Sequence, residues 1–192
     1  MKKFAAVAGI LTLASLALLF SARAQQFKEK TTVAQETKMP QPGPEMEKLK
    51  FLIGAWETKG GYEKSPMIPE GGAQTGWYKA QLGPGGFSVI ADFKAEGPLG
   101  KEVGHEILTW DPKQNAYTTI TVGNAFPGAN IGTAKWEGPD LVTVHEFEFC
   151  GTIIHLRGVI SKIQEKSVHM EEFSQSADGS YLAIWKADAT NK

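Results

Sequence analysis

Short apolar segments and turn-forming clusters alternate along the chain from residue 56 to residue 187. The segments are rich in β-branched and aromatic residues, and Gly, Pro, Asn and Asp gather between them, which is typical of β-strands joined by turns. The pattern predicts strands at residues 56–62, 74–81, 87–95, 103–110, 117–122, 131–136, 141–149, 153–163, 167–174 and 181–187.

One segment ahead of the strands has helical spacing. Apolar residues recur at three- and four-residue intervals between residues 44 and 53, which predicts a short helix with one apolar face. Pro44 is tolerated at the first helical position, and Gly54 is expected to end the helix. The apolar positions are Met46, Leu49, Leu52 and Ile53.

Consecutive strands with short connections leave no room for crossover helices, so we expect antiparallel pairing. A single open sheet of this length would expose two edges, and closing the sheet into a barrel removes them. The prediction is therefore an all-β protein, an antiparallel barrel of about 8–10 strands. A sandwich of two sheets would have the same periodicity and stays open as the alternative.

The first 24 residues have the layout of a secretory signal peptide. Lys2 and Lys3 precede an uncharged apolar run at 4–20, and Ala22-Arg23-Ala24 supplies the small residues that signal peptidase reads. Cleavage is expected before Gln25. The apolar run is slightly shorter than the roughly 20 residues of a spanning helix, so an uncleaved membrane anchor is the less favoured alternative.

Removal of residues 1–24 would leave a polar lead-in at 25–43 and a barrel domain at 44–192. The expected location is the periplasm or the outside of the cell, with no stable membrane insertion after cleavage. The mature chain would have 17 basic and 21 acidic side chains and a net charge of −4, which argues against a nucleic-acid partner. Cys150 is the only cysteine, so no intramolecular disulfide can form, and the role of its thiol stays open.

Several motifs occur in an order that resembles a known family. They are Leu-x-Phe-Leu-Ile-Gly-x-Trp at 49–56, the Gly-rich run at 82–87, Gly-His-Glu-Ile-Leu running into Trp-Asp-Pro at 104–112, Gly-Thr-Ala-Lys-Trp-Glu-Gly at 132–138 and Ser-Ala-Asp-Gly at 176–179. Together, over about residues 45–190, they resemble the bacterial family of unknown function 1579, a lipocalin-like group of the calycin type.

The resemblance implies a lipocalin-like barrel with one end closed by a helical turn. Gly54 would permit the tight turn into the first strand, and Trp56 would fill the barrel end. By the same resemblance, Lys186 on the last strand would lie across Trp56 in a cation–π contact. The motifs of this family imply no activity, so the resemblance supplies a fold and no mechanism.

The chain has no recognisable catalytic or phosphate-binding motif. Gly100-Lys101 lacks the upstream glycine of a phosphate loop, and there is no nucleophile elbow and no His-Glu-x-x-His zinc pair. The histidines all lie in predicted strands, where residues two apart share a face. His169 and Glu171 therefore share a face, and His145, on a largely apolar face, is expected to point into the barrel.

The leading candidate site lies inside the barrel. If the strands at 141–149 and 153–163 pair as a hairpin through Cys150-Gly151, His145 and Arg157 would approach each other in an apolar cavity. There they would orient a ligand carboxylate or donate a proton. The structural alternative is a satisfied buried histidine beside a structural arginine. The other residues assigned to the ligand are Phe147, Phe149, Trp110 and His155.

The main functional hypothesis is binding of a small, largely apolar molecule inside the barrel. One alternative is a barrel enzyme in which His145 or His155 and an inward-facing carboxylate perform acid/base chemistry. Another is a structural or interaction module that associates through its outer surface or through Cys150. No metal or cofactor is predicted. Haem is a less favoured alternative, because nitrobindin-type barrels bind it through a histidine on the final strand, and residues 181–187 contain none.

Overall fold

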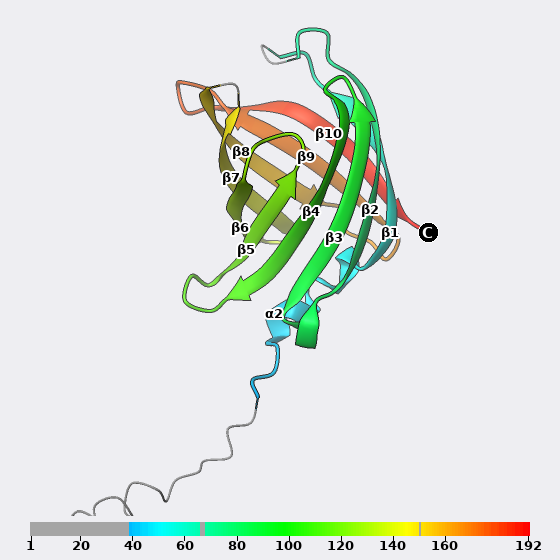
Figure 1. Cartoon of the computed structure of the whole chain (residues 1–192), viewed down its shortest axis with the longest axis vertical. Helices are drawn as coiled ribbons and strands as arrows, with labels where there is room; N and C mark the ends of the chain where they lie inside the picture. Colours follow the sequence, from blue (N-terminus) through cyan, green and yellow to red (C-terminus); the bar gives the residue numbers. More distant parts are fainter. Residues whose placement is uncertain (1–38, 66–67, 150) are drawn as a thin grey trace, which may run out of the picture. The chain divides into compact units, whose positions relative to one another are not determined.

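Ten antiparallel β-strands form a closed barrel in the computed structural model of the chain (Figure 1). The structure describes residues 39–65, 68–149 and 151–192, apart from the side chains of Phe147 and Phe149. The predicted signal peptide, the lead-in up to residue 38 and Cys150 lie outside the described residues. Among the described residues, no helix combines the length and the apolar character needed to cross a membrane.

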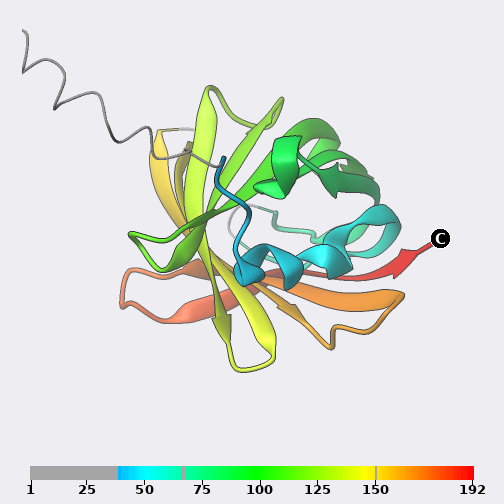
Figure 2. The same ribbon diagram turned by 90° about the horizontal axis from the view of Figure 1, so that it is seen from below.

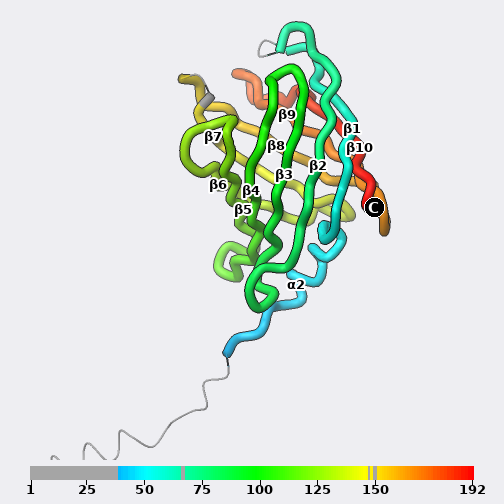
Figure 3. Tube along the Cα trace, turned by 45° about the vertical axis from the view of Figure 1, so that its right-hand side comes forward, coloured from blue at the N-terminus to red at the C-terminus, as the bar shows by residue number. Residues whose placement is uncertain are grey.

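Every strand predicted from the sequence is confirmed. Each strand pairs with the strands before and after it, and β1 pairs with β10 to close the ring, so the two-sheet sandwich is excluded. Successive strands follow one another around the barrel in Figures 1 and 3. The strands are β1 (Gly54–Tyr62), β2 (Gly72–Leu82), β3 (Ser88–Gly97), β4 (Gly100–Asp111), β5 (Ala116–Gly123), β6 (Ala129–Glu137), β7 (Asp140–Phe149), β8 (Thr152–Ser161), β9 (Ser167–Gln175) and β10 (Tyr181–Asn191).

The helix predicted at 44–53 is broken into two separate turns. α2 (Pro44–Glu47) is a single α-helical turn, and η1 (Lys50–Leu52) is a 3-10 turn. The apolar stripe is nevertheless used as expected, because Met46, Leu49 and Leu52 are all buried. Figure 2 shows this segment, in cyan, lying across one end of the barrel. The Gly-rich run between β2 and β3 forms another 3-10 turn, η2 (Pro84–Gly86).

Hydrogen bonds join the α2–η1 segment to the barrel end. The Trp56 Nε1 donates to the Leu52 carbonyl over 2.9 Å, and the Tyr117 hydroxyl donates to the Glu45 carbonyl over 2.8 Å. Gly54, between η1 and β1, has a φ of +126°, a conformation that other residues rarely adopt. The core lies where this segment meets the strands, and its buried members are Met46, Leu49, Leu52, Ala80, Val89, Ala91, Leu108, Tyr117, Ala134 and Leu141.

Side chains alternate between the lumen and the outer surface, and residues paired across neighbouring strands share a face. Two glycines mark close approaches between strands. A Cβ at Gly60 would collide with the Lys186 carbonyl, and a Cβ at Gly104 would collide with the Val122 carbonyl. Glycine at such positions lets a strand bend sharply, which a closed barrel requires.

Candidate functional site in the barrel lumen

The lumen contains a cavity of about 120 Å³ next to the end closed by α2 and η1. Eight of the twelve residues around it are apolar, and only one, Glu106, carries an ionisable carboxyl group. An engineered apolar cavity of about 150 Å³ is large enough to bind benzene, so this cavity suits a group of similar size or smaller. Its walls are Leu52, Trp56, Thr58, Tyr78, Glu106, Leu108, Leu141, Thr143, Ile160, Val168, Met170 and Ala189.

Three carboxyl groups face the lumen, and one of them, Glu106, belongs to the cavity wall. Glu102 and Glu106 come from β4, and Glu172 comes from β9, where it is paired with Gly158 on one side and Trp185 on the other. The lysines and arginines of the ten strands all lie at registers that face outward. The described inner wall therefore has a negative character, which opposes entry of an anion.

Burial raises the pKa of all three carboxyl groups. For Glu172 the pKa rises to about 7, first because of burial and then because of the charges of Glu102 and Glu106. Hydrogen bonds partly oppose the effect of burial at the other two: Tyr62 bonds Glu102, and Tyr78 bonds Glu106. Near neutral pH, Glu172 is thus a mixture of the acid and the carboxylate.

A hydrogen-bond network surrounds Glu102, toward the barrel end opposite the α2–η1 segment. The Trp185 Nε1 donates to Gln74 Oε1 over 2.7 Å, and Gln74 Nε2 donates to the Tyr62 hydroxyl over 3.3 Å. The Tyr62 hydroxyl and Gln74 Nε2 each donate to Glu102 Oε1 over 3.4 Å. Burial, followed by the charges of Glu102 and Glu172, raises the pKa of Tyr62, so this phenol remains a hydrogen-bond donor.

His145 and Arg157 do not approach each other, so the predicted pair inside the barrel is wrong. The β7–β8 hairpin forms as expected, but His145 pairs with Leu156, and Arg157 pairs with Val144. His145 therefore faces the lumen, and Arg157 lies on the outer surface. There the guanidinium bonds the Glu137 carboxylate over 2.9 Å.

The His–carboxylate pair required by the enzyme alternative is also missing among the described residues. His155 lies on the outer surface, with its Nδ1 3.1 Å from Glu146 Oε2. His145 makes no ion pair with a described carboxylate, its Nδ1 is buried without a hydrogen-bond partner, and burial lowers its pKa. It is therefore a neutral imidazole at physiological pH.

The three aromatic residues predicted to line the ligand cavity differ in what the structure shows. Trp110 faces inward, but it packs edge-to-face on Tyr117, with ring centroids 5.0 Å apart, in the core beside the α2–η1 segment. It is not among the described residues around the cavity. Phe147 and Phe149 have side chains outside the described structure, so their contribution to the wall stays a prediction.

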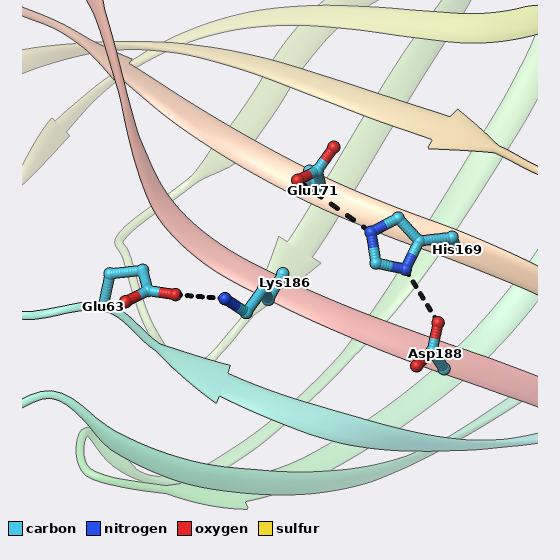
Figure 4. Close-up of polar contacts among 5 residues, drawn as sticks. All are labelled: Glu63, His169, Glu171, Lys186 and Asp188. Carbon is cyan, nitrogen blue, oxygen red and sulfur yellow. Dashed lines mark hydrogen bonds and ion pairs between the residues drawn. The ribbon is translucent and has the colours of Figure 1, made fainter.

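The predicted contact between Lys186 and Trp56 is wrong. Lys186 faces outward and forms an ion pair with Glu63 over 2.6 Å (Figure 4). Trp56 instead pairs with Asn191 on β10 and is buried in the barrel end. β10 carries its lysine on the outer face because Trp185, Ala187 and Ala189 occupy the inward registers.

His169 and Glu171 share the outer face of β9, as the two-residue spacing predicted. His169 Nε2 lies 3.9 Å from Glu171 Oε1, and its Nδ1 lies 2.7 Å from Asp188 Oδ1 (Figure 4). Among the described residues, no cluster of three His, Cys, Asp or Glu side chains is suited to a metal ion. The contact between His169 and Asp188 links β9 to β10 on the outer surface.

The inward-facing carboxyl groups were missed by the sequence analysis. Val168 and Met170 alternate with His169 and Glu171, and continuing this alternation places Glu172 on the apolar, inward side. The two consecutive glutamates concealed that signal, because either one fits a polar outer face. In β4, Glu106 precedes Leu108 at the same spacing, but Ile107 gives an equally good apolar face.

Comparisons with known proteins give the fold alone. No family model matches the chain, and no curated protein matches it. Among solved structures, Rv2717c from M. tuberculosis has a TM-score of 0.54 at 14% identity, covering 79% of this chain and 99% of that one. The S-type phycobiliprotein lyase CPES from Guillardia theta has a TM-score of 0.48 at 7% identity, covering 76% and 91%. A de novo designed fluorescence-activating β-barrel has a TM-score of 0.40 at 12% identity, covering 74% and 95%. The described chain therefore shares its closed antiparallel β-barrel fold with Rv2717c.

Proposed function

We propose that this protein binds a small, largely apolar molecule inside its barrel. The observation that supports the proposal is the cavity of about 120 Å³, with eight apolar residues in its wall and the α2–η1 segment closing the nearby barrel end. Concave, mostly apolar pockets with a few polar groups are the usual form of small-molecule sites. The proposal includes export by the predicted signal peptide, and membership of the family of unknown function 1579.

The charges of the lumen narrow the class of ligand. With Glu102, Glu106 and Glu172 facing inward and Arg157 outside, a carboxylate ligand would meet repulsion, and the described strands offer it no inward-facing lysine or arginine. A neutral ligand avoids that repulsion. The size of the cavity suits a single ring or a short branched alkyl group.

Toluene is the probe for this proposal. At a free concentration of about ten times its Kd, toluene should raise the free energy of unfolding by about 1.4 kcal/mol, because it binds only the folded barrel. On the wild-type protein, toluene should also shift the NMR signal of the Met170 methyl group, since Met170 lines the cavity. Benzoate should do neither.

A cavity-filling variant tests whether toluene enters the lumen. Ala189 is 2% exposed and lines the cavity, so Ala189→Leu should remove toluene binding. Ala183→Leu is the matched control, because Ala183 is exposed on the same strand and should leave binding unchanged. If the Met170 methyl signal of the folded wild-type protein stays unperturbed in buffer saturated with toluene, the proposal is overturned.

A further inference from the structure

Three buried polar atoms in the described structure have no hydrogen-bond partner, and all three lie on one part of the inner wall. They are Thr119 Oγ1, Asn130 Oδ1 and His145 Nδ1. Thr119 is fully buried, and Asn130 is 8% exposed. Buried polar groups without partners are uncommon in folded proteins, and each costs about 1–3 kcal/mol. A group of three on neighbouring strands therefore requires an explanation.

The three residues surround one glycine. In the barrel register Thr119 on β5 pairs with Gly132 on β6, and Gly132 pairs with His145 on β7. Asn130 lies two residues from Gly132 on the same face of β6. A Cβ at position 132 would collide with His145 Nδ1, so only glycine at this position gives the imidazole room to lie against β6.

This group adjoins the apolar cavity. Thr119 is paired with Leu108, and His145 is two residues from Thr143 on the same face of β7. Leu108 and Thr143 both line the cavity. A molecule with its apolar part in the cavity would thus have this group next to it.

We propose that Thr119, Asn130 and His145 form a polar subsite that binds an uncharged hydrogen-bonding head, a hydroxyl or an amide, of the lumen ligand. The inference rests on the proposed function and adds the chemistry of the ligand to it. Asn130 Oδ1 accepts a hydrogen bond, so the head carries at least one N–H or O–H donor. The Thr119 hydroxyl and the neutral imidazole each donate or accept, which allows the head to have an acceptor as well.

Phenol and toluene test the subsite because they differ only by a hydroxyl in place of a methyl group. A purely apolar cavity takes toluene and rejects phenol, since a buried hydroxyl without a partner costs about 2–7 kcal/mol. With the subsite, phenol should bind the wild-type protein at least as tightly as toluene. Phenol should also shift the ¹⁵N signal of His145 Nδ1 by more than toluene does.

Thr119→Val retains the shape of the side chain and removes its hydroxyl. The substitution should weaken the affinity for phenol by about tenfold, the equivalent of one hydrogen bond, and leave the affinity for toluene unchanged. Thr118→Val is the matched control, because Thr118 is on the same strand but faces outward, and it should change neither affinity.

The outcomes separate the subsite from the proposed function. Toluene binding together with exclusion of phenol, or phenol binding that Thr119→Val does not weaken, would overturn the subsite and leave the apolar site standing. Such a result would mean that the three atoms bind ordered water only. If neither probe enters the lumen of the folded wild-type protein, the proposed function fails and the subsite fails with it.

Discussion

Replacing Glu172 with glutamine should stabilise the barrel above neutral pH and leave it almost unchanged in mild acid. Glu172→Gln preserves the size of the side chain and removes its charge. That charge interacts with the charges of Glu102 and Glu106. The neighbours of Glu172 on the adjacent strands, Gly158 and Trp185, are uncharged. The neutral amide has no charge to desolvate. The variant therefore isolates the cost of ionising this one carboxyl group.

The size of the effect follows from the pKa. Glu172 has a pKa of about 7 in the folded barrel and an ordinary value of 4.5, and each pKa unit corresponds to about 1.4 kcal/mol. The full difference is about 3 kcal/mol. Because Glu172 is only partly buried, solvent screening reduces this value, and we expect about 1–3 kcal/mol. The folded state binds the proton more tightly, so this stability is complete below pH 4.5 and is lost as the pH rises through about 7.

Urea unfolding at about pH 4.5 and about pH 8, followed by tryptophan fluorescence, measures the difference. Glu172→Gln should be more stable than wild type at pH 8. Its free energy of unfolding should also fall less than that of wild type between the lower and the higher pH. Glu171→Gln is the control, because Glu171 lies on the outer face of the same strand. Equal pH slopes for wild type and Glu172→Gln, or a variant less stable than wild type at pH 8, would refute the reasoning.

Other substitutions test the packing and the faces of the barrel. Leu49→Ala should lower the free energy of unfolding by about 2–5 kcal/mol, because Leu49 is fully buried in the α2–η1 segment; exposed Lys48→Ala is its control. Arg157→Ala should cost less than about 1 kcal/mol and leave toluene affinity unchanged, because its ion pair is on the outer surface. Thr119→Val should stabilise the ligand-free protein by about 1 kcal/mol in urea unfolding, because it removes a buried hydroxyl that has no partner; a loss of stability would mean that this hydroxyl is satisfied.

The strands were predictable because each one carries its own periodicity and is bounded by turn residues. All ten were found, with ends displaced by a few residues, and the short connections were sufficient to predict antiparallel pairing. The helix was predicted less well. The apolar spacing of Met46, Leu49 and Leu52 describes which side is buried, but the packing of this segment on the barrel end decides whether one helix or two turns form.

The inner surface was harder to predict because it depends on register. In the β7–β8 hairpin, Phe149 pairs with Thr152, and the same register puts His145 opposite Leu156. Odd-numbered residues of β7 therefore share a face with even-numbered residues of β8, so Arg157 points away from His145. The sequence contained this information, since the position of the turn fixes the register of a hairpin.

In this register Arg157 faces outward, whereas a shift of one residue would have placed it in the lumen. The charge of the lumen is therefore the reverse of the one expected. With Arg157 inside, the wall would have balanced its carboxyl groups and attracted an anionic head. With Arg157 outside, Glu102, Glu106 and Glu172 face a lumen whose only described histidine is kept neutral by burial. A neutral wall of hydrogen-bonding groups at Thr119, Asn130 and His145 then remains as the place where a ligand head is held without a counter-charge. Discrimination between a hydroxyl and a carboxylate on the same ring therefore depends on which face of β8 carries its single arginine.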